Sequence, residues 1–246
     1  MMCLIRNMLI VIFEIFKCPN GEAVMLCEEF INTYWSQYIL LEKEFMATLH
    51  YLSLCEENEE AFSQAYVKLL LELGSEIDVV FKQYCANIDP SFNGKNMQDY
   101  QKCVLTNASD FIVQDVEEKI THRNMRPWNE WTHIPPRAPY WWNAYNRIKH
   151  NRTENSNIDN MEKVSYKFAN QKYTLLALAG LYQILVYTYY RLTQNENKRI
   201  CTPMPGSRLF ELKSGMWSDV QFYGDIALYL DEDNGCLCME TSTLCY

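Results

Sequence analysis

Glycine and proline are scarce in this chain, at eight residues each out of 246. Turn-rich architectures need many more of both, so the scarcity favours long regular elements. Nearly half of the residues are hydrophobic and 22% are charged. This composition is that of an ordinary globular protein and excludes disordered and fibrous classes.

Basic residues are also in deficit, with 22 Lys and Arg against 31 Asp and Glu, which gives a formal net charge of −9. An acidic chain is unsuited to coating nucleic acid along its whole surface, because that mode of binding depends on neutralising many phosphates. Any contact with an anionic partner must therefore be local.

Metal-binding patterns are missing although the chain has ten cysteines. No CxxC pair occurs, and the Cys236-Leu-Cys238 pair lacks a second ligand pair at zinc spacing. We expect buried free thiols in a reducing, cytoplasmic compartment, with no metal and no cofactor.

Long hydrophobic runs of the membrane type are lacking too. The run from Met1 to Phe16 is interrupted by Glu14, and no small-residue cleavage site follows it. We expect either an amphipathic first helix or an upstream extension of the natural start. The uncharged stretch from Tyr173 to Tyr190 contains five tyrosines, so we expect a core helix and no membrane partner.

Apolar residues recur at three- and four-residue steps through much of the chain, which is the spacing of amphipathic helices. We expect helices over 22–54, 60–87, 97–107, 140–152 and 161–194, with a polar loop at 153–160. Short strands are expected weakly within 111–131, and more clearly at 210–212 and 219–230. The predicted fold is all-α: an antiparallel helical bundle at 22–200, preceded by an apolar segment at 1–21 and followed by a small irregular or β appendage at 201–246.

One segment reverses the acidity of the chain. Residues 119–152 hold seven of the 22 Lys and Arg residues but a single acid, Glu130. The same segment holds four of the six tryptophans and three of the four histidines. A basic, aromatic surface on an acidic protein is the most plausible place for an anionic ligand to bind.

The predicted helix at 140–152 has two faces. Trp141, Tyr145 and Ile148 form an apolar stripe, and the polar residues gather on the opposite side. His150 and Arg147 are the candidate catalytic residues, because an imidazole can shuttle a proton and a guanidinium can hold phosphate. The candidate ligand-binding residues are Asn143, Asn146, Lys149 and Arg152. An equally open interpretation is that these residues form a polar network that only ties helices together.

The run from Pro139 to Arg152 (PYWWNAYNRIKHNR), followed by Phe168-Ala-Asn170 and by LLALAGLY at 175–182, resembles a group of HEPN-like helical proteins. The resemblance extends over about residues 22–192. It implies a helical bundle that often dimerises, in a superfamily of RNA-cleaving toxins, phage-defence effectors and nucleotide-binding modules. Catalytic members carry an arginine, then a polar residue, and a histidine after four to six intervening positions.

This chain departs from that catalytic pattern. Ile148 follows Arg147, and only two residues separate Arg147 from His150. Arg126 and His133 have six residues between them, but Pro127 follows the arginine in an expected loop.

Two functions remain open from the sequence. The first is a HEPN-like RNA- or nucleotide-binding protein, with a metal-independent ribonuclease of a bacterial defence or toxin system as its enzymatic form. In that form His150 would activate a ribose 2′-OH, and a homodimer would complete the site. The alternative is a non-catalytic helical homodimer or interaction module, such as an antitoxin or scaffold.

Overall fold

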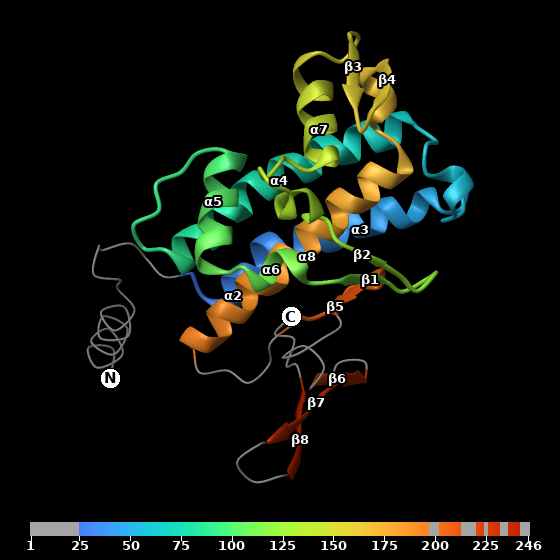
Figure 1. Ribbon diagram of the computed structural model, residues 1–246. Helices are drawn as coiled ribbons and strands as arrows, with labels where there is room; N and C mark the ends of the chain where they lie inside the picture. Colours follow the sequence, from blue (N-terminus) through green and yellow to red (C-terminus); the bar gives the residue numbers. More distant parts are fainter. Residues whose placement is uncertain (1–24, 197–201, 213–219, 224–225, 232–235, 242–246) are drawn as a thin grey trace, which may run out of the picture.

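The computed structural model describes residues 25–196 and 202–212, together with three strands at 220–223, 226–231 and 236–241 (Figure 1). The predicted N-terminal segment at 1–21 lies outside the described residues. Nothing in the structure therefore tests the helix expected there.

Two long helices, α4 (Gln64–Ile88) and α8 (Gln171–Asn195), pack against each other at the centre of the fold (Figure 1). Ser63 begins α4, because its side chain accepts a hydrogen bond from the Tyr66 amide at 3.1 Å. Helix α3 (Ser36–Thr48) runs alongside both and continues from the short helix α2 (Cys27–Phe30) through a π-helical turn. Side chains of α8 are buried on nearly all sides, as expected for a core helix. In the part of the chain that the structure describes, no helix combines the length and apolar character needed to cross a membrane.

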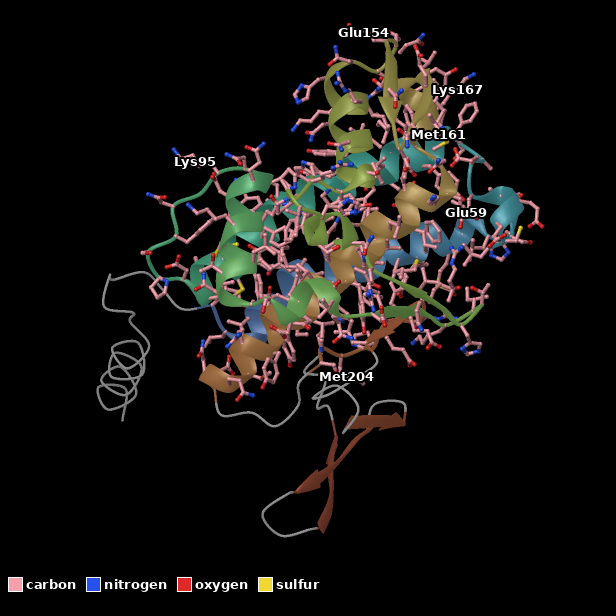
Figure 2. The ribbon with its side chains drawn as sticks, in the orientation of Figure 1. Glu59, Lys95, Glu154, Met161, Lys167 and Met204 are labelled. Atoms are coloured by element: carbon pink, nitrogen blue, oxygen red, sulfur yellow. The ribbon has the colours of Figure 1, made fainter. Side chains whose placement is uncertain are left out.

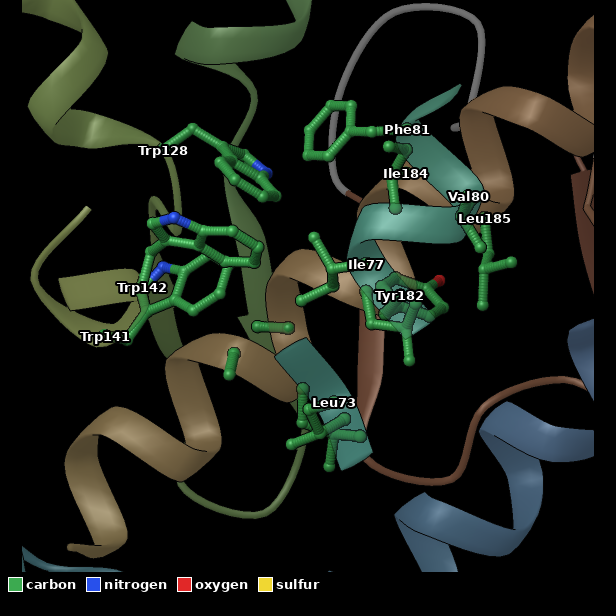
Figure 3. Close-up of a cluster of buried hydrophobic side chains, with 14 of the residues drawn as sticks. Leu73, Ile77, Val80, Phe81, Trp128, Trp141, Trp142, Tyr182, Ile184 and Leu185 are labelled. Atoms are coloured by element: carbon green, nitrogen blue, oxygen red, sulfur yellow. The ribbon is translucent and has the colours of Figure 1, made fainter. Parts of the chain in front are cut away.

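Helices α5 (Met97–Asn107), α6 (Asp110–Val113) and α7 (Tyr140–His150) complete the helical part. Between them lies an aromatic core in which Phe81 of α4 faces Trp128 (Figure 3), with ring centroids 4.8 Å apart. Phe81 also contacts Trp131, with ring centroids 5.7 Å apart. Trp128 in turn packs edge-on against Trp141 of α7 at 5.1 Å. Three of the four tryptophans of the basic segment thus anchor the core, each with about 1% of its surface exposed.

The all-α prediction is wrong, because the chain also forms three small antiparallel sheets. The first pairs β1 (Val116–Glu118) with β2 (Arg123–Met125) on one side and β5 (Phe210–Leu212) on the other. The second is the hairpin of β3 (Asn155–Ile158) and β4 (Met161–Val164). The third joins β6 (Val220–Tyr223), β7 (Ile226–Asp231) and β8 (Cys236–Thr241). The first sheet includes two short strands within 111–131, where strands were weakly expected, whereas the second lies where a loop and the start of a helix were expected.

The hairpin replaces the predicted loop at 153–160 and the first turns of the predicted helix at 161–194. Asp159 and Asn160 both have positive φ, at 53° and 59°, which gives a two-residue turn between paired strands. Helix α8 therefore begins later, at Gln171, where the Asn170 side chain accepts a hydrogen bond from the Tyr173 amide at 2.9 Å.

A buried carboxylate fastens the segment before β5 to helix α3. Glu42 is only 2% exposed and accepts hydrogen bonds from the Tyr38 hydroxyl at 2.8 Å and from the amides of Arg208 and Leu209 at 3.0 and 3.1 Å. The Ser207 hydroxyl is also bonded to this carboxylate. Burial and the neighbouring Glu42 charge raise the pKa of Tyr38 well above its usual value, so this hydroxyl remains a donor.

Candidate functional site

Helix α7 carries all but one of the candidate residues, and its aromatic face fixes its position. Trp141, Trp142, Tyr145 and Ile148 are buried against α4 and α8. The Trp141 indole N–H donates to the Pro127 carbonyl at 2.8 Å, which secures the start of the helix to the preceding loop. The polar face of α7 is consequently turned away from the core.

Four basic residues are exposed on or just after that polar face: Arg147, Lys149, His150 and Arg152. Among the described residues, none of them forms an ion pair with an acid. Lys149 donates to the Tyr145 hydroxyl at 3.1 Å on its own helix, and the Arg152 Nε lies 3.5 Å from the Ile148 carbonyl. Cations in the last turn of a helix are stabilised by its dipole, so part of this charge has a structural role.

A cleft of about 600 Å³ opens beside α7, between that helix, the middle of α4 and the start of α5. Three of the predicted ligand-binding residues, Asn143, Asn146 and Lys149, line it. The remaining lining comes from Ser75, Asp78 and Val79 of α4, from residues 95–98, and from Ala138, Trp142 and Tyr145. The cleft has the size of a small-molecule site, and its lining combines apolar side chains with several polar groups.

The electrostatics of the cleft are set by two lysines, because its one acid is already paired. Asp78 accepts from Lys82 at 3.0 Å and from the Tyr100 hydroxyl at 2.9 Å. Burial, and then the hydrogen bond to Asp78, raise the pKa of Tyr100, so its hydroxyl stays protonated. Lys95 and Lys149 have no carboxylate partner among the described residues, which leaves the cleft with an excess of positive charge.

The start of α5 forms one wall of this cleft. The Asn96 side chain accepts from the amides of Gln98 and Asp99 at 3.0 and 3.2 Å, and the Asp99 carboxylate accepts from the Lys95 amide at 2.8 Å. These bonds hold Lys95 and Gln98 in place at the rim. In Figure 2, Lys95 projects from the loop that leads into α5, while Glu154 lies at the far end of α7.

The structure divides the predicted site residues into two groups. Asn143, Asn146 and Lys149 belong to the cleft, whereas His150, Arg147 and Arg152 lie on the adjoining exposed surface and do not line it. The separation follows from helix geometry, since residues one apart point about 100° away from each other. Arg126 and His133, the other arginine and histidine at a suggestive spacing, do not form a site. Arg126 is paired with Asp115 at 2.6 Å, and His133 is exposed after a short 3-10 turn.

Sequence reasoning missed the part of the cleft that comes from α4 and from the start of α5. Ser75 and Asp78 have the spacing of any solvated helix face, so no local signal marked them. Lys95 and Asn96 did carry a signal, because a turn followed by an asparagine cap brings polar groups to a helix start.

No group of three or more His, Cys, Asp or Glu side chains in the described ranges is placed to hold a metal ion. The described cysteines at positions 27, 55, 85 and 103 are free thiols. Burial raises the pKa of the Cys85 thiol, which disfavours its reactive thiolate form.

Comparison with known proteins gave no match: no family model, no curated protein and no solved structure matches this chain.

Proposed function

We propose that the cleft beside α7 binds a nucleotide unit, either free or at the end of a single-stranded RNA. The observation that carries the proposal is the presence of Lys95 and Lys149, neither of which is paired with an acid among the described residues, in one cleft that Trp142 and Tyr145 also line. Phosphate oxygens are the natural acceptors for two ammonium groups held in this way. The resemblance of the α7 sequence to HEPN-like proteins supports the same ligand class.

The amide side chains of the cleft would serve base recognition. Asn143, Asn146 and Gln98 each offer a donor and an acceptor, which can pair with the edge of an unstacked base. Val79 and Ala138 offer apolar surface for the base or the ribose. The exposed guanidinium groups of Arg147 and Arg152 would then meet the phosphates of an adjoining nucleotide, beside the His150 imidazole.

If the protein is an enzyme, the reaction proposed for this site is metal-independent cleavage of RNA. His150 would take the proton of a ribose 2′-OH, whose oxygen would attack the adjacent phosphorus and displace the 5′-oxygen of the next nucleotide. The products would be a 2′,3′-cyclic phosphate and a 5′-hydroxyl that takes its proton from water, while Arg147, Asn146 and Lys149 would stabilise the charge on the phosphate. A second protein copy would complete the site, as the resemblance implies. We further infer a cytoplasmic location, which rests on the buried free thiols of Cys85 and Cys103.

Binding is tested by fluorescence anisotropy with a labelled single-stranded RNA and by calorimetry with AMP. Lys95→Ala and Lys149→Ala should each weaken binding by about tenfold, the loss expected for one charge-assisted hydrogen bond. Lys68→Ala is the matched control, because Lys68 is already paired with Glu44 at 2.9 Å. Equal affinities for the wild type and both cleft variants would refute the proposed site.

Cleavage is tested separately, by incubating the purified protein with RNA in EDTA. Wild-type cleavage that is lost in His150→Ala, with binding retained, would support the ribonuclease. If wild type and variant are equally inert while binding is retained, the protein is a binding module. If RNA and AMP both fail to bind, the non-catalytic homodimer or interaction module becomes the better explanation.

A further inference from the structure

A second hollow, of about 650 Å³, lies on another part of the described surface. Three segments that are distant in sequence build it: most of α3 with the residues just after it, the β1–β2 turn, and the loop before β5. Its walls are mainly apolar and consist of Ile39, Met46, Ala47, Leu49, Ile120 and Pro205. We call this hollow the α3 groove. It shares no residue with the cleft beside α7.

The groove is held open by contacts that fix its far wall. The Trp35 indole N–H donates to the Pro205 carbonyl at 2.8 Å, and Lys119 donates to the Ser207 carbonyl. Glu42 bonds the amides of Arg208 and Leu209, as described above. The loop before β5, which forms this wall of the groove, is therefore held in place by several hydrogen bonds.

Cations surround the apolar walls. Lys43, His50 and Arg208 line the groove, and none of their side chains forms a hydrogen bond or ion pair with a described residue. Glu42 is the one acid of the lining, and its carboxylate already has four hydrogen-bond donors. Lys43 and Arg208 together outweigh its charge, so the groove is positive on a protein whose net charge is −9.

We propose that the α3 groove binds an aliphatic chain that ends in an anionic head group, of the medium-chain carboxylate type. The apolar walls would bury the methylene chain and so remove its surface from water. Lys43, Arg208 and His50 would hold the head group at the rim by charge-assisted hydrogen bonds. The combination of apolar walls with unpartnered cations selects an amphipathic anion over a neutral or cationic chain.

Calorimetry with three ligands of equal chain length tests the head group: decanoate, decan-1-ol and decyltrimethylammonium, each below its aggregation concentration. Decanoate should bind at one site, about tenfold or more tighter than decyltrimethylammonium, since charged hydrogen bonds are worth about 1.5–3 kcal/mol. Lys43→Ala combined with Arg208→Ala should remove this preference and leave decan-1-ol binding unchanged. Equal affinities of the wild type for all three ligands, or no decanoate binding at all, would overturn the proposal.

Whether decanoate binds in the α3 groove is tested by substitutions that fill the groove with a larger side chain. Ala47→Trp replaces an exposed helix residue of the lining and should abolish decanoate binding, whereas Ala86→Trp, at an exposed position of α4 outside the groove, should not. Ile120 is 52% exposed, so Ile120→Asp and Ile120→Ser should both fold, and only the aspartate adds repulsion of the carboxylate. Decanoate binding that survives Ala47→Trp, or that neither Ile120 variant weakens, would exclude this groove.

Discussion

At the scale of single residues, Gly74 determines how closely α7 can approach α4. A Cβ atom at this position would lie 2.4 Å from the Tyr145 ring, so an alanine requires Tyr145 to move. Alanine would gain about 1 kcal/mol of helix propensity, but overpacking of a tight contact costs about 1–3 kcal/mol. We therefore expect Gly74→Ala to lower the free energy of unfolding, as measured in urea.

The neighbouring Ser75→Ala is the matched control for that change, because Ser75 is an exposed residue of the same helix. It should be neutral or slightly stabilising. Tyr145 also contributes to the cleft, so Gly74→Ala should weaken AMP binding as well. A Gly74→Ala protein that is more stable than the wild type by the full gain in helix propensity, about 1 kcal/mol, would show that Tyr145 is not in close contact with this position.

Glu130 is the residue from which we predict how stability depends on pH. Burial, and next the nearby Asp159 charge, raise its pKa above the usual value of 4.5, although its own amide and Lys172 oppose the shift. The folded protein thus holds this proton more tightly than the unfolded chain. Its contribution to stability is present at low pH and is lost as pH rises through the folded-state pKa.

We accordingly expect Glu130→Gln to be more stable than the wild type at pH 7, with the difference shrinking towards pH 4. Unfolding in urea at a series of pH values measures this. Glu162→Gln removes an exposed carboxylate and controls for the change in net charge. A gain from Glu130→Gln that is constant over this range would contradict the assignment.

At the scale of elements, the β3–β4 hairpin depends on two residues in the left-handed region. Asparagine tolerates this conformation, glycine adopts it freely, and other residues are penalised by about 1–2 kcal/mol. Asn160→Ala should therefore lower the free energy of unfolding by about 1 kcal/mol, and Asn160→Gly should change it by only a few tenths. Thermal denaturation of the two variants measures the difference, and equal losses would show that the turn is not of this type.

Comparison of the predicted and observed elements shows which helices and strands can be predicted from sequence patterns. The helix predicted at 97–107 is found at those residues, because it carries a clear apolar period and an asparagine cap. The observed ends of α4 and α7 lie within a few residues of the predicted ends. The hairpin was missed because its strands are four residues long and polar, and hydrophobic alternation is too weak a signal in Asn155-Ser-Asn-Ile158. The strand β1 was uncertain because Glu117 and Glu118 are buried despite their charge.

The candidate site was predicted in part for a related reason. Which residues share the polar face of α7 follows from helix periodicity, and Asn143, Asn146 and Lys149 do lie together in the cleft. What lies opposite them depends on how α4 and α5 pack against α7. Tertiary contacts of that kind leave no local periodicity, so Ser75, Asp78 and Lys95 could not be assigned from the sequence.

At the scale of the whole molecule, charge is distributed unevenly enough to set the salt dependence of ligand binding. The protein is acidic overall, yet Lys95, Arg147, Lys149 and Arg152 have no acidic partner among the described residues. If they contact RNA phosphates, log K should fall linearly with log salt, with a slope of about −0.7 per neutralised phosphate for a single strand. The slope therefore counts how many of these cations bind phosphate.

We expect Lys149→Ala and Arg152→Ala each to make that slope shallower by about 0.7, in addition to weakening binding at any one salt concentration. Lys68→Ala should leave the slope unchanged, because its ammonium group is already neutralised by Glu44. Anisotropy titrations between low and moderate salt measure all four proteins. A cation that affects affinity but leaves the slope intact would act through folding or base recognition. A slope unaltered by every variant would mean that RNA binds elsewhere, because only residues that displace counterions can alter it.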